Sequence, residues 1–263
     1  MEYIGYLIVG FITGIMSGLL GIGGGVIMVP ALVAIFDSHH YGGNYLMQLA
    51  TGTSLSAMII TTLMTTWANQ KHGTVRWSML SLLIPGTVMG ALIGVWVAKD
   101  VDTQVLQIIF AIFAVLLGFN LILGSKATTV KKPVSLHPIF TFICAMLIGI
   151  LAGLLGIGGG ILLIPFLLWF GFSMKESSAT SAACAFMTSL AGAIMAVIAG
   201  WHIQGLPSHS VGFVYWPVAL GLGIASMISA PLGVKLAHRL PVHTIKRLFG
   251  VVLWGIAVRM ILT

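Results

Sequence analysis

The chain has 263 residues, of which 59% are hydrophobic and only 6% are charged, and its mean hydropathy is +1.11. Soluble domains carry about 25% charged residues, so the composition excludes a water-soluble globule and predicts an all-α protein that crosses a membrane several times. The net charge of +7 does not indicate nucleic-acid binding, because no basic face outside the apolar segments would carry it.

Eight hydrophobic regions follow one another along the chain, four before a polar linker and four after it. We expect the first four at residues 3–36, 47–68, 78–98 and 104–123, and the second four at residues 138–171, 179–200, 214–234 and 245–262. The first region of each set is interrupted by glycines, whereas the other three are long enough to span a bilayer.

An internal duplication relates the two sets. The string GLLGIGGG at residues 18–25 recurs at residues 153–160, and residues 75–110 align without gaps on residues 214–249. A looser match relates Thr51 to Thr180. We therefore predict a first transmembrane repeat at 1–124, a basic cytoplasmic linker at 125–137 and a second repeat at 138–263.

The distribution of Lys and Arg predicts the orientation. If each interrupted region returns to the face from which it enters, as a re-entrant hairpin or as two short spans, ten of the twelve Lys and Arg fall on one face; if each crosses once, the split is six and six. The positive-inside rule favours the first arrangement. It predicts a multi-pass protein of the cytoplasmic membrane with both termini extracytoplasmic and with inverted repeats, as in many secondary transporters.

Small residues recur every fourth position in four of the predicted helical regions. The positions are Gly10, Gly14 and Gly18; Ala145, Gly149 and Gly153; Gly86, Gly90 and Gly94; and Ala225, Ser229 and Gly233. In lipid, such faces let two helix backbones approach closely. We interpret them as packing surfaces.

The glycine clusters are the candidate site. Each glycine weakens a helix by about 1 kcal/mol relative to alanine, and a break frees N–H groups that lipid cannot satisfy. Helices that restart after the breaks would aim their N-termini at a central anion. The predicted backbone donors are Gly21, Gly23, Gly24, Gly25, Gly156, Gly158, Gly159 and Gly160. The alternative is that these glycines only let helices cross; a nucleotide loop is excluded because no lysine follows.

Hydroxyl side chains begin the span that follows each break. These side chains are Thr51, Thr53, Ser54, Thr180 and Ser181. They are either donors to an anion or partners of carbonyls in their own helices, and the sequence leaves both readings open.

The acidic residues indicate which substrates to exclude. All five carboxylates are predicted at span ends or in loops, at Glu2, Asp37, Asp100, Asp102 and Glu176. Cation transport and proton relays normally use an acid within the membrane, so we expect an anionic or neutral substrate. The sequence has no cluster with metal-ligand spacing and no combination of side chains for nucleophilic catalysis. We therefore predict no metal, no cofactor and no enzymatic activity.

These motifs resemble the TauE/SafE sulfite exporter family. The resemblance is carried by the duplicated G-x-x-G-x-G-G-G followed by Pro30 and Pro165, the Thr/Ser-rich span starts, and His72-Gly73-x-Val75-x-Trp77. It implies a bacterial or archaeal transporter of duplicated helical repeats that exports sulfite, sulfonates or related organosulfur anions. Alternatives are an anion-selective channel and a membrane scaffold without transport activity. The expected partners are the small anion and the lipid bilayer, and a homo-oligomer is left open.

Overall fold

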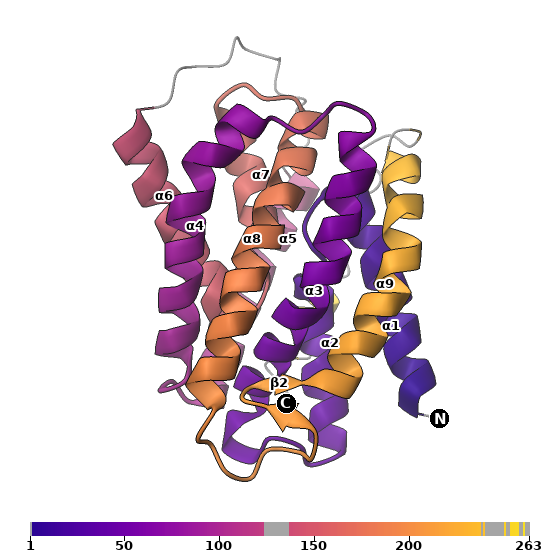
Figure 1. The fold of residues 1–263 in the computed structure, drawn as a ribbon, viewed down its shortest axis with the longest axis vertical. Coiled ribbons are helices and arrows are strands. Elements are labelled where there is room, and N and C mark those ends of the chain that lie inside the picture. The colour runs from indigo at the N-terminus through magenta and orange to yellow at the C-terminus, as the bar shows by residue number, and fades with distance from the viewer. Residues whose placement is uncertain are drawn as a thin grey trace.

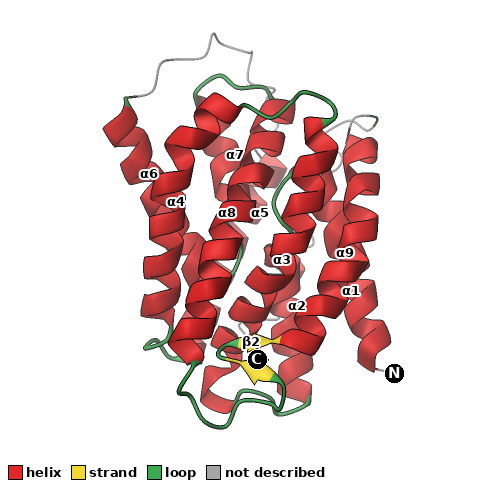
Figure 2. Ribbon diagram, in the orientation of Figure 1, coloured by secondary structure: helices red, strands yellow, loops and turns green. Residues whose placement is uncertain are grey.

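A computed structural model of the chain describes residues 2–123, 137–237, 239, 250, 253–257 and 260. These residues form helices almost throughout, together with one short hairpin of two strands (Figure 2). The predicted linker at 125–137 and the predicted last span at 245–262 lie mostly outside the described residues.

Helices before the linker include both halves of the first interrupted region. They are α1 (Glu2–Leu20), α2 (Gly25–Ser38), the 3-10 helix η1 (Gly43–Tyr45), α3 (Leu46–Gln70), α4 (Trp77–Ala98) and α5 (Thr103–Leu123). After the linker come α6 (Pro138–Leu155), α7 (Gly160–Trp169), α8 (Met174–Gly200), the strands β1 (Ser210–Val211) and β2 (Val214–Tyr215), and α9 (Trp216–Ala237). Five of these, namely α3 with η1, α4, α6, α8 and α9, are long and apolar enough to cross a membrane.

The two interrupted regions are divided where the glycines predict it. The helix ends at Leu20 in the first region and at Leu155 in the second, and a new helix starts at Gly25 and at Gly160. One boundary differs from the prediction, because α8 already begins at Met174, before the expected span at 179–200. The cause is a capping box, in which the Ser173 side chain accepts the N–H of Glu176 and the Glu176 carboxylate accepts the N–H of Ser173.

Two long helices lie side by side in the middle of the bundle. These are α3 and α8 (Figure 1), and α3 is the most enclosed of the five spanning helices. The short helix α2 packs against α3, and the short helix α7 packs against α8. On one flank α1 packs against α9, and on the other α4 packs against α6. Both short helices are thus held against the central pair.

The small-residue faces form the two flanking helix pairs, which confirms their interpretation as packing surfaces. A Cβ atom added to Gly14 of α1 would lie 2.7 Å from the Ser226 Cα atom of α9. On the other flank, a Cβ atom added to Gly90 of α4 would overlap the Met146 carbonyl oxygen of α6 and lie 2.8 Å from the Ile150 nitrogen. Both helix pairs are therefore in direct backbone contact.

Replacement of Gly90 by alanine tests this close packing. The added methyl group would meet backbone, so the two helices must separate, and we expect Gly90→Ala to lower the free energy of unfolding by about 1–3 kcal/mol. The control is Gly221→Ala in α9, where nothing lies within 4 Å of the added Cβ atom. Thermal unfolding in detergent should show a lower Tm for Gly90→Ala and an equal or higher Tm for Gly221→Ala; equal Tm values would contradict the packing.

Candidate functional site

Each glycine break has the same backbone conformation. Three glycines in each break have positive φ, with values of 70°, 80° and 86° at Gly21, Gly23 and Gly24 and of 67°, 67° and 76° at Gly156, Gly158 and Gly159. A side chain would strain the backbone at such angles, which explains why glycine occupies all six positions. The last glycine of each set is the N-cap of the restarting helix, Gly24 for α2 and Gly159 for α7.

The two breaks cross each other inside the bundle, with backbone against backbone. A Cβ atom added to Gly25 would lie 2.6 Å from the Gly156 carbonyl oxygen, and one added to Gly160 would lie 2.8 Å from the Gly21 carbonyl oxygen. Every residue of both glycine clusters is buried. The structure therefore brings together all eight glycines that the sequence predicts for the site.

Two of the predicted hydroxyls bond to the backbone of the breaks. The Ser54 hydroxyl of α3 donates to the Gly156 carbonyl at 3.1 Å, and the Ser181 hydroxyl of α8 donates to the Gly21 carbonyl at 3.0 Å. Each of these helices thus bonds to a carbonyl of the break that belongs to the other half of the chain. These contacts hold the two breaks together.

The predicted threonines bond to other parts of the protein. The Thr53 hydroxyl accepts the N–H of Tyr215 at 3.0 Å, and the Thr180 hydroxyl accepts the N–H of Arg76 at 3.1 Å. Thr51 donates to the Gln48 carbonyl in its own helix at 2.9 Å. All five predicted hydroxyls therefore have partners within the protein.

These contacts correct the register of the looser sequence match. The sequence relates Thr51 to Thr180, but the equivalent hydrogen bonds pair Thr53 with Thr180 and Ser54 with Ser181. The error arose because α3 has threonine at both positions 51 and 53, so a single threonine in α8 matches either. Helix contacts resolve the ambiguity.

Backbone N–H groups of the breaks remain without acceptors. In the part of the chain that the structure describes, no hydrogen bond is made by the N–H groups of Gly23, Gly24, Gly25, Gly158, Gly159 and Gly160. The first bonded N–H group of each restarting helix belongs to Ile27 and to Leu162. Buried N–H groups without partners are rare in proteins, and at helix N-termini they favour negative charge. The crossing is therefore suited to bind an anion.

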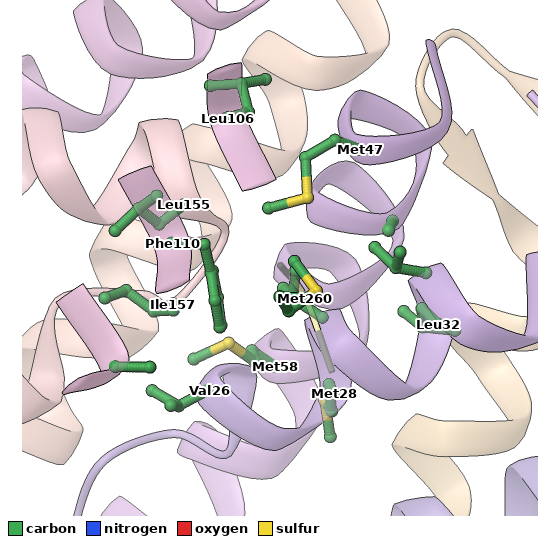
Figure 3. Packing of buried hydrophobic residues seen from close by; sticks show 14 of the residues in the cluster. Val26, Met28, Leu32, Met47, Met58, Leu106, Phe110, Leu155, Ile157 and Met260 are labelled. Atoms are coloured by element: carbon green, nitrogen blue, oxygen red, sulfur yellow. The ribbon is translucent and has the colours of Figure 1, made fainter. Parts of the chain in front are cut away.

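Three side chains that the sequence did not suggest also line the breaks. A Cβ atom added to Gly23 would overlap the Met58 methyl carbon and lie 3.2 Å from the Thr62 methyl carbon. One added to Gly158 would overlap the same Met58 carbon and lie 2.8 Å from the Ser189 hydroxyl oxygen. Met58 thus lies between the two breaks, within a buried apolar cluster (Figure 3).

Two of these positions, Thr62 and Ser189, could have been predicted from a pattern in the sequence. In the register that pairs Ser54 with Ser181, Thr61 and Thr62 of α3 are matched by Thr188 and Ser189 of α8. A search for hydroxyl pairs at a constant spacing, continued two turns beyond the span starts, would have identified this second pair. The position of Met58, in contrast, depends on how the breaks cross.

We call Thr53 and Thr180 the two threonine anchors, because each accepts an N–H group from a distant segment. Different contacts surround them. Next to Thr180, the Arg76 guanidinium forms an ion pair with Glu176, with its Nε atom donating to Oε1 at 2.8 Å. Next to Thr53, the Tyr215 ring packs edge-on against Phe36 and Tyr41, with centroids 6.0 and 5.7 Å apart. One anchor is therefore polar and the other aromatic.

A separate cavity of about 690 Å³ lies at the α2–α3 and α4–α5 connections. Its described lining includes Gln48, Lys99, Asp102 and Gln107 and contains no residue of the breaks. We therefore do not include it in the candidate site.

Comparison with known proteins gives a family. A family model described as sulfite exporter TauE/SafE matches residues 6–260. The chain belongs to this family. It is 32% identical over 257 residues to a probable membrane transporter protein of Haemophilus influenzae, with 97% of each chain covered. It is also 32% identical over 243 residues to one of Methanocaldococcus jannaschii, covering 90% of this chain and 87% of the relative.

A third TauE/SafE relative is the probable membrane transporter protein YunE of Bacillus subtilis, which is 28% identical over 271 residues and covers 96% of this chain and 95% of the relative. No solved structure gives a significant match. Family and relatives point to a membrane transporter and not to an enzyme, and the apolar helices agree with a multi-pass membrane protein.

The two serine contacts can be tested as a pair. We expect Ser54→Ala and Ser181→Ala each to lower the free energy of unfolding by about 1 kcal/mol, because a buried carbonyl loses its partner. Ser56→Ala is the control, since the Ser56 hydroxyl bonds to Gly52 within its own helix. The measurement is thermal unfolding in detergent. If both variants unfold like the control, the serines do not hold the breaks together.

Proposed function

We propose that this TauE/SafE chain is a secondary transporter that moves small anions, sulfite or organosulfonates, out of the cell across the cytoplasmic membrane. The observation that carries the proposal is the set of buried N–H groups without acceptors at the two crossed breaks of the described structure, six of which belong to glycines. Donors without a fixed negative partner favour an anion over a cation. The described acidic side chains, Asp37, Asp100, Asp102 and Glu176, lie at helix ends or in connections.

Sulfur oxyanions are proposed as substrates because of the family. The matching family model is described as a sulfite exporter, and an oxyanion presents several acceptor oxygens to converging N–H groups. The protein supplies its charge complement through helix N-termini, without a buried lysine or arginine at the breaks among the described contacts.

We further propose that residues 1–124 and 138–263 are inverted repeats. Support comes from the reciprocal pairing of α1 with α9 and of α4 with α6, and from the reciprocal contacts of Ser54 and Ser181. The α3–α4 connection and the α7–α8 connection lie at one end of the bundle (Figure 1). The first contains Lys71 and Arg76, and Lys175 lies in the first turn of α8, next to the second. This basic end would be cytoplasmic, with both termini on the other side.

Alternating access would use the two threonine anchors. We propose that the Arg76 segment closes the cytoplasmic path when it bonds to Thr180, and that the Tyr215 segment closes the outer path when it bonds to Thr53. Each anchor threonine directly precedes the serine that bonds to a break, Ser54 or Ser181. Release of one anchor at a time would therefore expose the anion to one side only.

Alanine at the two N-cap glycines tests the site. In vesicles containing the purified protein, we expect Gly24→Ala and Gly159→Ala to reduce sulfite flux about ten-fold or more, because strain at positive φ displaces the N–H donors. The control is Gly205→Ala, which has φ of 85° and open space around the added Cβ atom. Wild-type flux in both variants would place the anion site elsewhere.

Exchange kinetics separate a transporter from an anion-selective channel. A transporter that alternates access carries substrate in both directions, so sulfite inside the vesicles should accelerate the uptake of labelled sulfite several-fold over uptake into vesicles loaded with chloride. A channel shows no such acceleration and passes a steady current under voltage. The measurement is uptake of radiolabelled sulfite at matched membrane potential.

A further inference from the structure

We propose that the anion binds in the space that Met58 fills between Gly23 and Gly158, with the Ser189 hydroxyl as its side-chain donor, and that residue 58 sets the size of the anion. This inference rests on the proposed anion transport. It assigns roles to two residues that lie outside the glycine clusters and outside the hydroxyls predicted at the span starts.

The Met58 side chain fills the space between Gly23 and Gly158. Its methyl carbon is the atom nearest to a Cβ position on both Gly23 and Gly158, so this one side chain lies between these two glycines. Methionine is unbranched and adopts many rotamers, and the polar contact of its sulfur is a weak one, from the Ser54 hydroxyl at 3.9 Å. It can therefore move aside when an anion enters.

The two sides of this space differ in size. In the register that pairs Ser54 with Ser181, Met58 of α3 corresponds to Ala185 of α8, whose Cβ atom lies 3.9 Å from a Cβ position on Gly23. A large side chain from α3 thus faces a small one from α8. The length of residue 58 decides how much room remains for a ligand.

The Ser189 hydroxyl has no partner among the described residues. The residue is fully buried, and its oxygen makes no hydrogen bond in the described structure. Its counterpart Thr62 donates to the Met58 carbonyl at 2.6 Å. A buried hydroxyl without a partner lowers stability, and the Ser189 oxygen lies 2.8 Å from a Cβ position on Gly158, beside N–H groups that are also unpaired.

Together these groups select a small oxyanion with a short apolar substituent. The oxygen atoms would accept hydrogen bonds from the N–H groups and from Ser189. An alkyl substituent would contact the apolar cluster that contains Met58, Val26 and Ile157 (Figure 3). Alkanesulfonates have this chemistry, and the length of their chain is the variable that residue 58 controls.

The size role is tested by substitution of Met58. Binding of sulfite and of alkanesulfonates with one to four carbons is measured by thermal shift on the purified full-length protein. We expect Met58→Ala to strengthen binding of the longest sulfonates about ten-fold relative to sulfite. Met58→Leu, which has nearly the same volume, should keep the wild-type order, as should Met64→Ala on another side of the same helix. A wild-type order of affinities in Met58→Ala would overturn the size role.

The donor role is tested by Ser189→Ala, which removes a single oxygen atom. We expect the unliganded variant to be at least as stable as the wild type, because an unpaired buried hydroxyl is lost. Sulfite binding should nevertheless weaken about ten-fold. Ser56→Ala should leave the affinity unchanged. Wild-type affinity in Ser189→Ala would overturn the donor role, and this variant decides the question even if Met58→Ala does not fold.

The outcomes separate this inference from the proposed function. If the wild-type protein neither binds nor transports sulfite or any of the sulfonates, the proposed function fails. If it binds and transports them, and Gly24→Ala and Gly159→Ala abolish flux while Met58→Ala and Ser189→Ala behave like the wild type, the anion binds at the breaks but not in the space between Gly23 and Gly158.

Discussion

Non-helical backbone deep inside a membrane protein has no water to bond with, and this constraint explains the arrangement around the two glycine breaks. Each break exposes carbonyl and N–H groups that lipid would leave unsatisfied. The protein satisfies carbonyls of both breaks with serines, Ser54 for Gly156 and Ser181 for Gly21. The N–H groups next to them receive no such partners from the described residues. At the crossing, carbonyls of both breaks are therefore bonded, whereas the neighbouring N–H groups have no acceptor among the described residues.

In the proposed anion site, this separation of donors from acceptors would give a preference for negative charge without charged side chains. A lysine or arginine in the crossing would carry its charge in every state, and its desolvation would cost several kcal/mol. Helix N-termini supply partial positive charge that is fixed by the fold and needs no counter-ion. Glycine at positions 23 and 158 also allows a ligand to approach the backbone closely. In this proposal, substrate preference and the close crossing of the breaks depend on the same glycines.

Much of this could be predicted from the sequence, for reasons that differ between features. Three consecutive glycines, as at residues 23–25, interrupt a helix whatever surrounds them, so the breaks were predictable. Which helix meets a small-residue face was not, because Gly14 is a local feature whereas its neighbour Ser226 is determined by the whole fold. The position of Met58 could not be predicted either, since the direction of its side chain into the breaks depends on how they cross. The early start of α8 could have been predicted, because Ser173 and Glu176 form a capping-box pattern in the sequence.

The pairing of α1 with α9 has a consequence for how the protein is made. The glycine face of the first helix meets its partner only after synthesis has passed Trp216, where α9 begins. Until then Gly10, Gly14 and Gly18 must face lipid or another transient neighbour, while α4 finds α6 much sooner. The small-residue face of α1 therefore finds its partner helix later in synthesis than the face that α4 and α6 share.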